Sequence, residues 1–134
     1  MPITRCETLP IRVESDVVLS RQLVRKWATE SKFGLVEQTK MVTAASELAR
    51  NTLNYGGGGT MRIELLEEST RRGLRLVFED QGPGIADLEL ALRDGYTTGG
   101  GLGLGLSGSK RLVNEFELVS TLGVGTRVTI TRWK

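Results

Sequence analysis

The spacing of apolar side chains changes along the chain, and each spacing predicts a different kind of element. Residues 9–14 alternate between apolar and polar, which is the pattern of an edge strand. Apolar residues then recur three and four positions apart, which predicts one helix between Ser15 and Gly34 and a second over about 37–54. The four-glycine tract 56–59 ends the second helix, and we interpret it as a flexible connector without chemistry of its own.

The second half of the chain predicts four strands and one further helix. Short apolar runs separated by turn residues predict two pairs of strands, and a helical spacing lies between the pairs. The glycine-rich stretch 81–105 is too long for a passive connection, so we expect it to be functional. The predicted elements are strands 60–66, 74–79, 117–120 and 126–133 and a helix over about 106–116.

This order of elements predicts an α+β protein. We expect a two-layer α/β sandwich in which helices cover one face of a mixed, mostly antiparallel sheet. With 134 residues the chain is about the size of one ordinary domain, so residues 1–134 are predicted to form a single domain.

Composition excludes several classes of function. The chain has no histidine, which rules out Ser-His-Asp catalysis and His-ligated metal sites. Its 18 basic and 16 acidic residues form no basic stripe, so we expect no nucleic-acid partner. The single cysteine, Cys6, cannot form an internal disulfide, and no apolar run approaches the roughly 20 residues that span a bilayer. We therefore expect a cytoplasmic protein with no membrane partner.

A glycine-rich run at 99–108 is a candidate for chemistry, and three interpretations compete for it. Gly103, Gly105 and Gly108 fit the dinucleotide fingerprint, but no strand precedes them and no acidic residue follows about 20 positions later. The spacing from Gly103 to Lys110 resembles a P-loop, but serine precedes lysine, which reverses the required order. The third interpretation is a backbone cradle for an anion ahead of a helix; on this segment alone, a plain surface loop stays open.

A polar face on the second predicted helix offers a different kind of chemistry. Glu47 and Asn51 are four residues apart, so their side chains lie on one face beside an apolar stripe. A carboxylate next to a neutral amide suits a general base beside a hard metal ion that prefers oxygen ligands. The alternative for these two residues is a solvated outer face.

A compact turn, Asp80-Gln81-Gly82-Pro83-Gly84-Ile85, directly follows an apolar strand. Gly82 and Gly84 permit a sharp turn and Pro83 stiffens it, which leaves Asp80 at the end of the strand. A carboxylate in that place can accept a hydrogen bond from an exocyclic amine such as that of adenine. A purely structural turn is the alternative.

These motifs, in this order, resemble the GHKL (Bergerat-fold) ATPase superfamily, which includes gyrase, Hsp90, histidine kinases and MutL. The N-box of that superfamily, Glu-x-x-x-Asn, is matched by 47–51, and its first glycine box, Asp-x-Gly-x-Gly, by 80–84. The lid and second glycine box are matched by 98–105, and the late Gly-Thr by 125–126. The resemblance implies the Bergerat fold, with ATP and Mg²⁺ as cofactors and an ATP lid over the site.

Within the superfamily, the likeness is strongest to the small bacterial anti-sigma-factor and stressosome switch serine/threonine kinases of the RsbT type. The segments 46–51 and 99–103 and the later 110–112 carry this likeness. Histidine kinases need a phosphoacceptor histidine, which this sequence lacks, and the gyrase, Hsp90 and MutL types are much longer.

The resemblance implies a protein serine/threonine kinase that transfers the γ-phosphate of ATP to a STAS-domain antagonist and switches partners. A PP2C-type phosphatase or a sigma factor is a further candidate partner. The alternative is a nucleotide-gated binding module, or an anti-sigma factor that sequesters a regulator with little or no kinase activity. A homodimer through the first strand is also left open.

The resemblance further implies a role for each matched residue. Glu47 is the expected catalytic base, Asn51 the ligand of Mg²⁺, and Asp80 the acceptor for the adenine amine, with Thr126 beside it. The base and ribose are expected to lie against the turn, and backbone amides of the lid to cradle the phosphates. The remaining expected nucleotide contacts are Gly82, Gly84, Ile85, Gly99, Gly101, Leu102, Gly103, Gly105 and Lys110.

Overall fold

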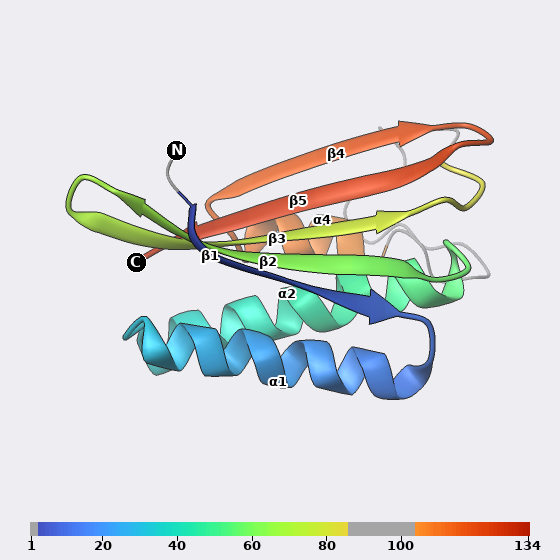
Figure 1. Cartoon of the computed structure of the whole chain (residues 1–134). Coiled ribbons are helices and arrows are strands. Elements are labelled where there is room, and N and C mark those ends of the chain that lie inside the picture. Colours follow the sequence, from blue (N-terminus) through green and yellow to red (C-terminus); the bar gives the residue numbers. More distant parts are fainter. Residues whose placement is uncertain (1–2, 86–103) are drawn as a thin grey trace.

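A computed structural model describes residues 3–85 and 104–134 of the chain (Figure 1). The described helices are α1 (Glu14–Glu30), α2 (Leu35–Asn54) and α4 (Leu104–Arg111). The strands are β1 (Ile3–Ile11), β2 (Gly59–Glu68), β3 (Arg71–Asp80), β4 (Glu115–Thr121) and β5 (Gly125–Trp133). None of the helices in these ranges has the length and apolar character that crossing a membrane requires.

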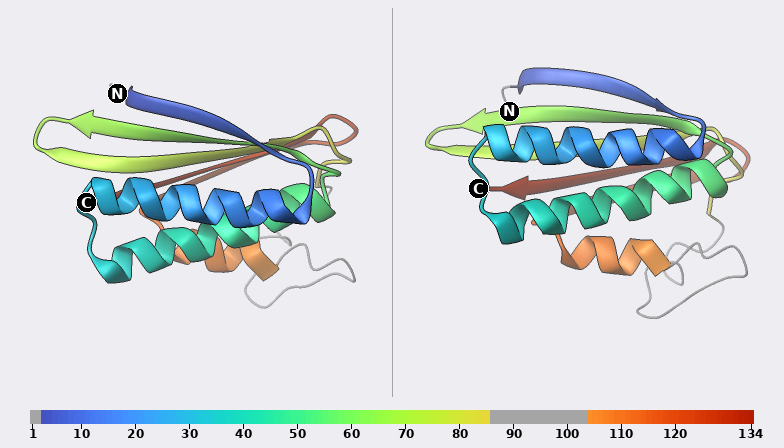
Figure 2. Two further views of the ribbon diagram at one scale, coloured as in Figure 1. Left: turned by 60° about the horizontal axis from the view of Figure 1, so that its bottom comes forward. Right: turned by 90° about the horizontal axis from the view of Figure 1, so that it is seen from below.

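The five strands form one sheet in the order β1-β2-β3-β5-β4, and every described pair is antiparallel. The predicted two-layer α+β architecture is confirmed, with the helices on one face of the sheet (Figure 1). The predicted, mostly antiparallel sheet is thus confirmed, although the described strands include no parallel pair of the kind that a mixed sheet contains. The two helices after β1 run in opposite directions and return the chain to the end where β1 stopped, so that Ile11 lies opposite Gly59 (Figure 2). Strand β2 therefore runs antiparallel to β1.

The core lies between the sheet and the helices. On the central strands, alternate residues point toward the helices and are almost fully buried, because successive side chains of a strand point to opposite faces. Helices α1 and α2 contribute facing apolar stripes, and burying one such large side chain stabilises the fold by roughly 1.5–3 kcal/mol. The largest buried residues include Trp27, Met41, Leu48, Met61, Ile63, Leu76, Phe78, Leu106 and Ile130.

The ends of α1 differ from the prediction in a way that the hydrogen bonds explain. At its start, Oδ2 of Asp16 accepts hydrogen bonds from the N–H groups of Arg12 at 2.8 Å and of Val13 at 3.1 Å, so the helix begins before Asp16. At its end, Lys32 takes the left-handed conformation (φ 64°), and the N–H of the next residue, Phe33, donates to Ala28 at 2.9 Å.

Gly34 is therefore not the stop of α1, as we predicted, but the residue that precedes α2. Its N–H donates to Oε1 of Glu37 at 3.1 Å, which is the expected contact at a helix N-terminus. The predicted second helix and the four predicted strands are confirmed, with ends that differ by a few residues.

The third helix, α4, is shorter than predicted. We expected it to continue to residue 116, but it ends at Arg111 and β4 begins at Glu115. The reason is that the N–H of Asn114 already donates to the carbonyl of Thr131 at 2.9 Å, so pairing with β5 begins there. An apolar residue such as Phe116 fits both a helical and a strand spacing, which is why periodicity alone misplaced this boundary.

Candidate functional site

The end of the sheet where β3 stops brings several predicted residues together. Asp80 is the last residue of β3 and lies opposite Gly59 on one neighbouring strand and Thr126 on the other. Residues of one strand that are two positions apart point to the same face, so Asp80 faces the helix layer as buried Phe78 does. The carboxylate accepts a hydrogen bond from the N–H of Gly82 at 2.9 Å, which closes the turn.

Asp80 is partly buried and has no cationic partner among the described residues. Burial raises the pKa of its carboxyl above the usual value, although the N–H groups of Gly82 and Thr126 lower it, and the charge of Glu79 adds to the rise. Such a carboxylate is incompletely compensated by the protein. A ligand that donates a hydrogen bond to it therefore gains from the interaction.

Gly56, which follows α2, packs directly against this carboxylate. A methyl group at Gly56 would overlap the Asp80 side chain, and one at Gly82 would lie 2.7 Å from the backbone of Gly56. The N–H of Gly56 donates to the carbonyl of Asn51 at 3.1 Å. The glycine tract is thus part of the site and not the flexible connector that we predicted, because a residue without Cβ is required for α2 to approach the end of β3.

The turn after Asp80 is held from the other side by the connection between β4 and β5. The N–H of Ile85 donates to Oγ of Ser120 at 2.7 Å, and the N–H of Gly123 donates to the carbonyl of Pro83 at 2.9 Å. Gly84 has φ +78°, and a methyl group there would overlap the backbone of the β4–β5 turn. These contacts place the predicted residues Gly82, Gly84 and Ile85 in one fixed turn beside Thr126.

Ser120 is a site residue that the sequence interpretation missed. Its Oγ lies 3.0 Å from Oγ1 of Thr126 and donates to the carbonyl of Gly125 at 3.3 Å, so one hydroxyl joins the turn, β4 and β5. A signal was present in the sequence. On β4 the positions that face the helices are Phe116, Leu118 and Ser120, and the last of them is polar where an apolar residue would be expected.

The polar face of α2 lies beside the same end of the sheet. Glu47 and Asn51 are both half-buried, one turn apart, between fully buried Leu48 and Ala49. The side-chain nitrogen of Asn51 is buried without a hydrogen-bond partner among the described residues. Within the described part of the chain Glu47 forms no hydrogen bond or ion pair, so both polar groups are available to a ligand.

Helix α4 contains two of the predicted nucleotide contacts, and they lie at different ends. Gly105 is in the first turn, where backbone N–H groups have no partner within the helix. Lys110 is exposed in the last turn. The chain just beyond that turn is held to β5 at Arg132, which donates a hydrogen bond to the carbonyl of Leu112. Arg132 lies six residues along β5 from Thr126, and therefore far from the Asp80 end of the sheet. This placement does not favour a phosphate contact for Lys110. The predicted contacts Gly99, Gly101, Leu102 and Gly103 lie outside the described residues.

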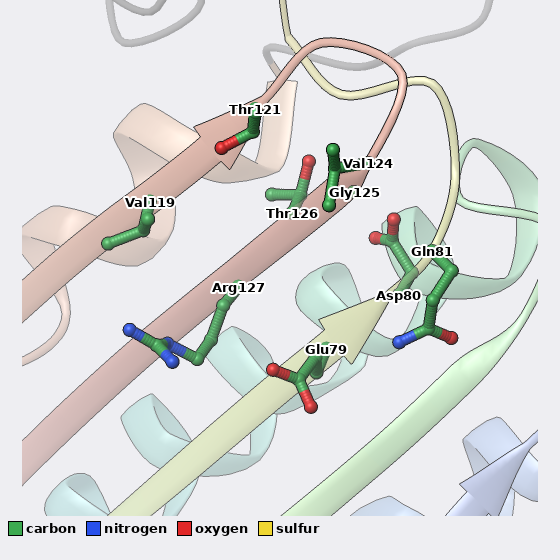
Figure 3. Close-up of a pocket in the computed structure, with 9 residues that line it drawn as sticks. All are labelled: Glu79, Asp80, Gln81, Val119, Thr121, Val124, Gly125, Thr126 and Arg127. Atoms are coloured by element: carbon green, nitrogen blue, oxygen red, sulfur yellow. The ribbon is translucent and has the colours of Figure 1, made fainter.

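A pocket near Asp80 lies mainly on the other side of the sheet (Figure 3). The pocket is lined by Glu79, Val119 and Arg127, among others. Their register places these three side chains on the open face of the sheet, which the helices do not cover; in Figure 3 the helices lie behind the strands. Asn51 and Glu47 do not line it. We therefore place the candidate site on the helix face, between α2 and the Asp80 turn.

The arrangement on the helix face fits a purine nucleotide with a bound cation. Asp80 offers an acceptor at the end of β3, and the side-chain amide of Asn51, which no hydrogen bond holds, can turn its oxygen toward a cation. The first turn of α4 has backbone N–H groups without a partner inside the helix, and such groups suit an anion. Together these groups can hold a base at one end and phosphates at the other.

Comparison with known proteins agrees with this geometry. Residues 36–134 match the family described as histidine kinase-, DNA gyrase B-, and HSP90-like ATPase. The chain is 47% identical over 123 residues to the serine/threonine-protein kinase RsbT of Bacillus subtilis (strain 168), covering 92% of each chain.

More distant relatives carry a different name. The anti-sigma F factor of Clostridium kluyveri is 31% identical over 98 residues, covering 70% of this chain and 69% of the relative. That of Clostridium novyi (strain NT) is 30% identical over 99 residues, covering 69% and 68%. The match over most of the chain, together with the Glu47–Asn51 face and the Asp80 turn, shows that this protein belongs to the histidine kinase-, DNA gyrase B- and HSP90-like ATPase family.

Proposed function

We propose that this chain is an ATP-dependent protein serine/threonine kinase of a bacterial partner-switching pathway. The observation that carries the proposal is the approach of α2 to the end of β3, where Gly56 joins the Asn51 turn of the helix to Asp80. The relative with 47% identity, which is named a serine/threonine-protein kinase, supports the same activity.

Asp80 binds the adenine end of the nucleotide in this proposal. Its carboxylate accepts a hydrogen bond from the exocyclic amine, and Thr126 lies directly opposite on β5 to assist. The base lies against the turn whose shape Gly82 and Gly84 allow, and Ile85, which is 8% exposed, supplies apolar contact. Guanine carries an oxygen at the equivalent position, so the same carboxylate would discriminate against it.

Asn51 would hold a Mg²⁺ ion through its side-chain oxygen, and the ion would neutralise charge on the phosphates; the amide, whose nitrogen has no hydrogen-bond partner among the described residues, is not held in another orientation. The lid glycines Gly99, Gly101 and Gly103, with Leu102, complete the phosphate contacts, and Gly105 at the start of α4 contributes a backbone N–H. We leave Lys110 out of this set because of its place at the far end of α4.

Glu47 is the general base. It lies one turn before Asn51 on the same face of α2, so its carboxylate would face an acceptor hydroxyl held at the phosphate end of the nucleotide. Glu47 accepts the proton of the acceptor serine or threonine while the γ-phosphoryl group passes from ADP to that oxygen. Phosphoryl transfer depends mainly on alignment and charge neutralisation, and a general base typically adds 10²–10⁴-fold.

The partner in this proposal is a STAS-domain antagonist, with a PP2C-type phosphatase or a sigma factor as a second partner in a stressosome-like cytoplasmic pathway. The anti-sigma F factors among the relatives favour one alternative, in which the chain mainly sequesters a regulator and ATP controls its affinity. The two functions differ in whether phosphate reaches the partner.

The test is phosphate transfer from Mg-ATP to candidate STAS-domain proteins, followed by mapping of the modified residue. We expect Glu47→Gln to lower the transfer rate by about 10²–10⁴-fold with ATP affinity almost unchanged. Glu117→Gln, an exposed carboxylate on β4, is the matched control and should transfer normally. Equal transfer by wild type and Glu47→Gln would exclude Glu47 as the base. Nucleotide-dependent binding of the partner without any transfer would favour the alternative.

A further inference from the structure

One end of the molecule brings together cations that lie far apart in the sequence. The β2–β3 hairpin, the last residues of β5 and the end of α1 lie side by side there, at the opposite end of β3 from Asp80 (Figures 1 and 2). Between them is a pocket of about 240 Å³ in which four of the six lining residues are basic and none is acidic. The lining residues are Ser31, Lys32, Thr70, Arg71, Arg72 and Lys134. The fold therefore concentrates positive charge that is scattered along the sequence.

The pocket forms because the β2–β3 hairpin extends past the end of the helix layer (Figure 1). Arg72 lies two residues before buried Leu74 on β3, so it points the same way, toward the helix side. Helix α1 ends at Glu30, and Lys32 turns the chain toward α2 in the left-handed conformation (φ 64°). Lys134 lies beside Arg72, because its N–H donates to the Arg72 carbonyl at 2.8 Å. The space beyond the end of the helix is thus lined by long cationic side chains.

Arg71 is held at this pocket by an aromatic platform. Its guanidinium lies over the ring of Trp133, 4.0 Å from the ring centroid. The indole N–H of Trp133 donates to Oε2 of Glu115 at 2.6 Å, which fixes the ring. Gly73 makes room for it, because a methyl group there would lie 2.7 Å from the ring. A stacked guanidinium keeps the N–H groups of its edge for an anion and loses little freedom when it binds one.

The nearby carboxylates compensate the two arginines only weakly. Arg71 contacts Glu68 at 3.3 Å and Arg72 contacts Glu67 at 3.7 Å, and neither glutamate lines the pocket. All four side chains are between 42% and 50% exposed. Exposed ion pairs of this kind hold their partners weakly, because water competes for both charges. An anion in the pocket can therefore recruit both guanidinium groups.

The two lysines have no partner for their amino groups within the described part of the chain. A cation just after a helix complements the negative end of the helix dipole, which accounts for Lys32. It does not account for Lys134 or for the two arginines, which belong to the strands and their ends. Like charges that surround one pocket repel one another, and a bound anion offsets that repulsion.

We infer that this pocket is an anion-binding site and that its ligand is a compact oligophosphate. Arginines present paired N–H groups that match phosphate oxygens, and the lysines and the hydroxyl of Thr70 add further donors. Four cations can meet the adjacent charges of a diphosphate together, whereas a single phosphate would leave some of them unmatched. The inference is independent of the proposed kinase activity, because it uses none of the residues that we propose to bind ATP.

Pyrophosphate without Mg²⁺ is the probe, and calorimetric titration of the full-length chain is the first test. We expect the Kd to rise about 10-fold or more in the double variant Arg72→Gln, Lys134→Gln, because two charged donors are lost. The matched control, Lys26→Gln with Arg127→Gln, removes the same charge from exposed positions elsewhere and should bind pyrophosphate as the wild type does. An absence of saturable binding at millimolar pyrophosphate, or an equal loss in both double variants, would overturn the inference.

Backbone amide shifts in the NMR spectrum of the wild-type chain locate the site without any substitution. Pyrophosphate should move the resonances of Lys32, of residues 70–72 and of Lys134. This measurement also separates the pocket from the nucleotide site, where a diphosphate has a second place to bind. Shifts confined to the neighbourhood of Asn51 and the start of α4 would assign the bound pyrophosphate to the nucleotide site and contradict the inference.

Inorganic phosphate tests the class of ligand. If the four cations act together on adjacent phosphate groups, inorganic phosphate should bind about 10-fold more weakly than pyrophosphate, and the double variant should reduce this preference. The same titration measures both ligands. Equal affinities for the two would indicate a site for single anions and would exclude an oligophosphate as the intended ligand.

Discussion

Two carboxylates on neighbouring strands, Asp80 and Glu64, are both shielded from water, but they differ in whether the protein supplies a cationic partner. Glu64 on β2 is only 3% exposed although it points to the open face of the sheet, because Arg62 and Arg75 bind it at 3.0 and 2.5 Å. Asp80 on β3 points to the helices, no cation lies beside it in the described part of the chain, and burial raises its pKa. The fold satisfies Glu64 itself, whereas no cation among the described residues does so for Asp80, which is why we propose that a ligand completes its interactions.

This difference separates a carboxylate that stabilises the fold from one that we propose to act in binding. A buried charge with hydrogen-bonded partners is mainly a structural element, and breaking it leaves uncompensated groups behind. A partly buried charge without a cationic partner costs stability, which makes it a candidate for a functional role. The comparison therefore predicts that the two residues affect different measurements when they are replaced.

The largest expected effect is on nucleotide binding by Asp80→Asn. Asparagine keeps an acceptor for the Gly82 N–H but presents an amide nitrogen where the ligand amine requires an acceptor. Losing a hydrogen bond to a charged group costs about 1.5–3 kcal/mol, so the Kd for ATP should rise roughly 10- to 100-fold. Calorimetric titration measures it. The thermal midpoint without nucleotide should not fall, and a large fall would mean that Asp80 is structural after all.

Glu64→Gln should show the opposite pattern. The amide cannot compensate both arginines, so we expect the free energy of unfolding to fall by about 1–3 kcal/mol, at the low end if solvent reaches Arg62 and Arg75. Urea unfolding gives this value. The Kd for ATP should remain within about twofold, because Glu64 lies on the face away from the site. A loss of ATP binding without loss of stability would break the comparison.

Ser120→Ala tests whether the β4–β5 connection positions the Asp80 turn. Removing the hydroxyl leaves the Ile85 N–H without its acceptor, which should cost about 1 kcal/mol, appearing as a roughly fivefold weaker affinity for ATP. Ser120→Thr, which keeps a hydroxyl, should restore part of the affinity. The same titration compares the three proteins; identical affinities would show that the turn holds its shape without Ser120.

The smallest expected effect is in the pH dependence of stability. Because the folded pKa of Asp80 lies above its usual value of 3.8, the contribution of this group is fully present below that value and is lost as the pH rises through the folded pKa. Wild type should therefore lose stability relative to Asp80→Asn between about pH 4 and neutrality. Urea unfolding of both proteins across this range isolates the effect, since other groups cancel in the difference. A constant difference would contradict the raised pKa.

The sequence predicted the elements that depend on local pattern. The strands at 60–66 and 74–79 and the helix at 37–54 follow directly from apolar spacing, and Asp80, Glu47 and Asn51 follow from motif spacing. The structure brings Asp80 and the Asn51 turn together, although about 30 residues separate them in the chain.

What the sequence did not reveal depends on contacts between distant segments. Gly56 looked like part of a linker, because nothing local shows that Asp80 would occupy the space beside it. Ser120 gains its role only when β4 is placed next to the turn. Gly34 was taken as a helix stop because glycine is the usual residue there, whereas Lys32 adopts the left-handed conformation instead.

The contacts between the β4–β5 turn and the Asp80 turn also determine which residues are free to evolve. The Gly123–Pro83 hydrogen bond joins main-chain atoms, so it does not depend on the side chains on either side of Gly123. Those side chains, Leu122 and Val124, are each 64% exposed. The tip of this hairpin can therefore change its surface chemistry from one member of the family to the next while the turn after Asp80 keeps its shape.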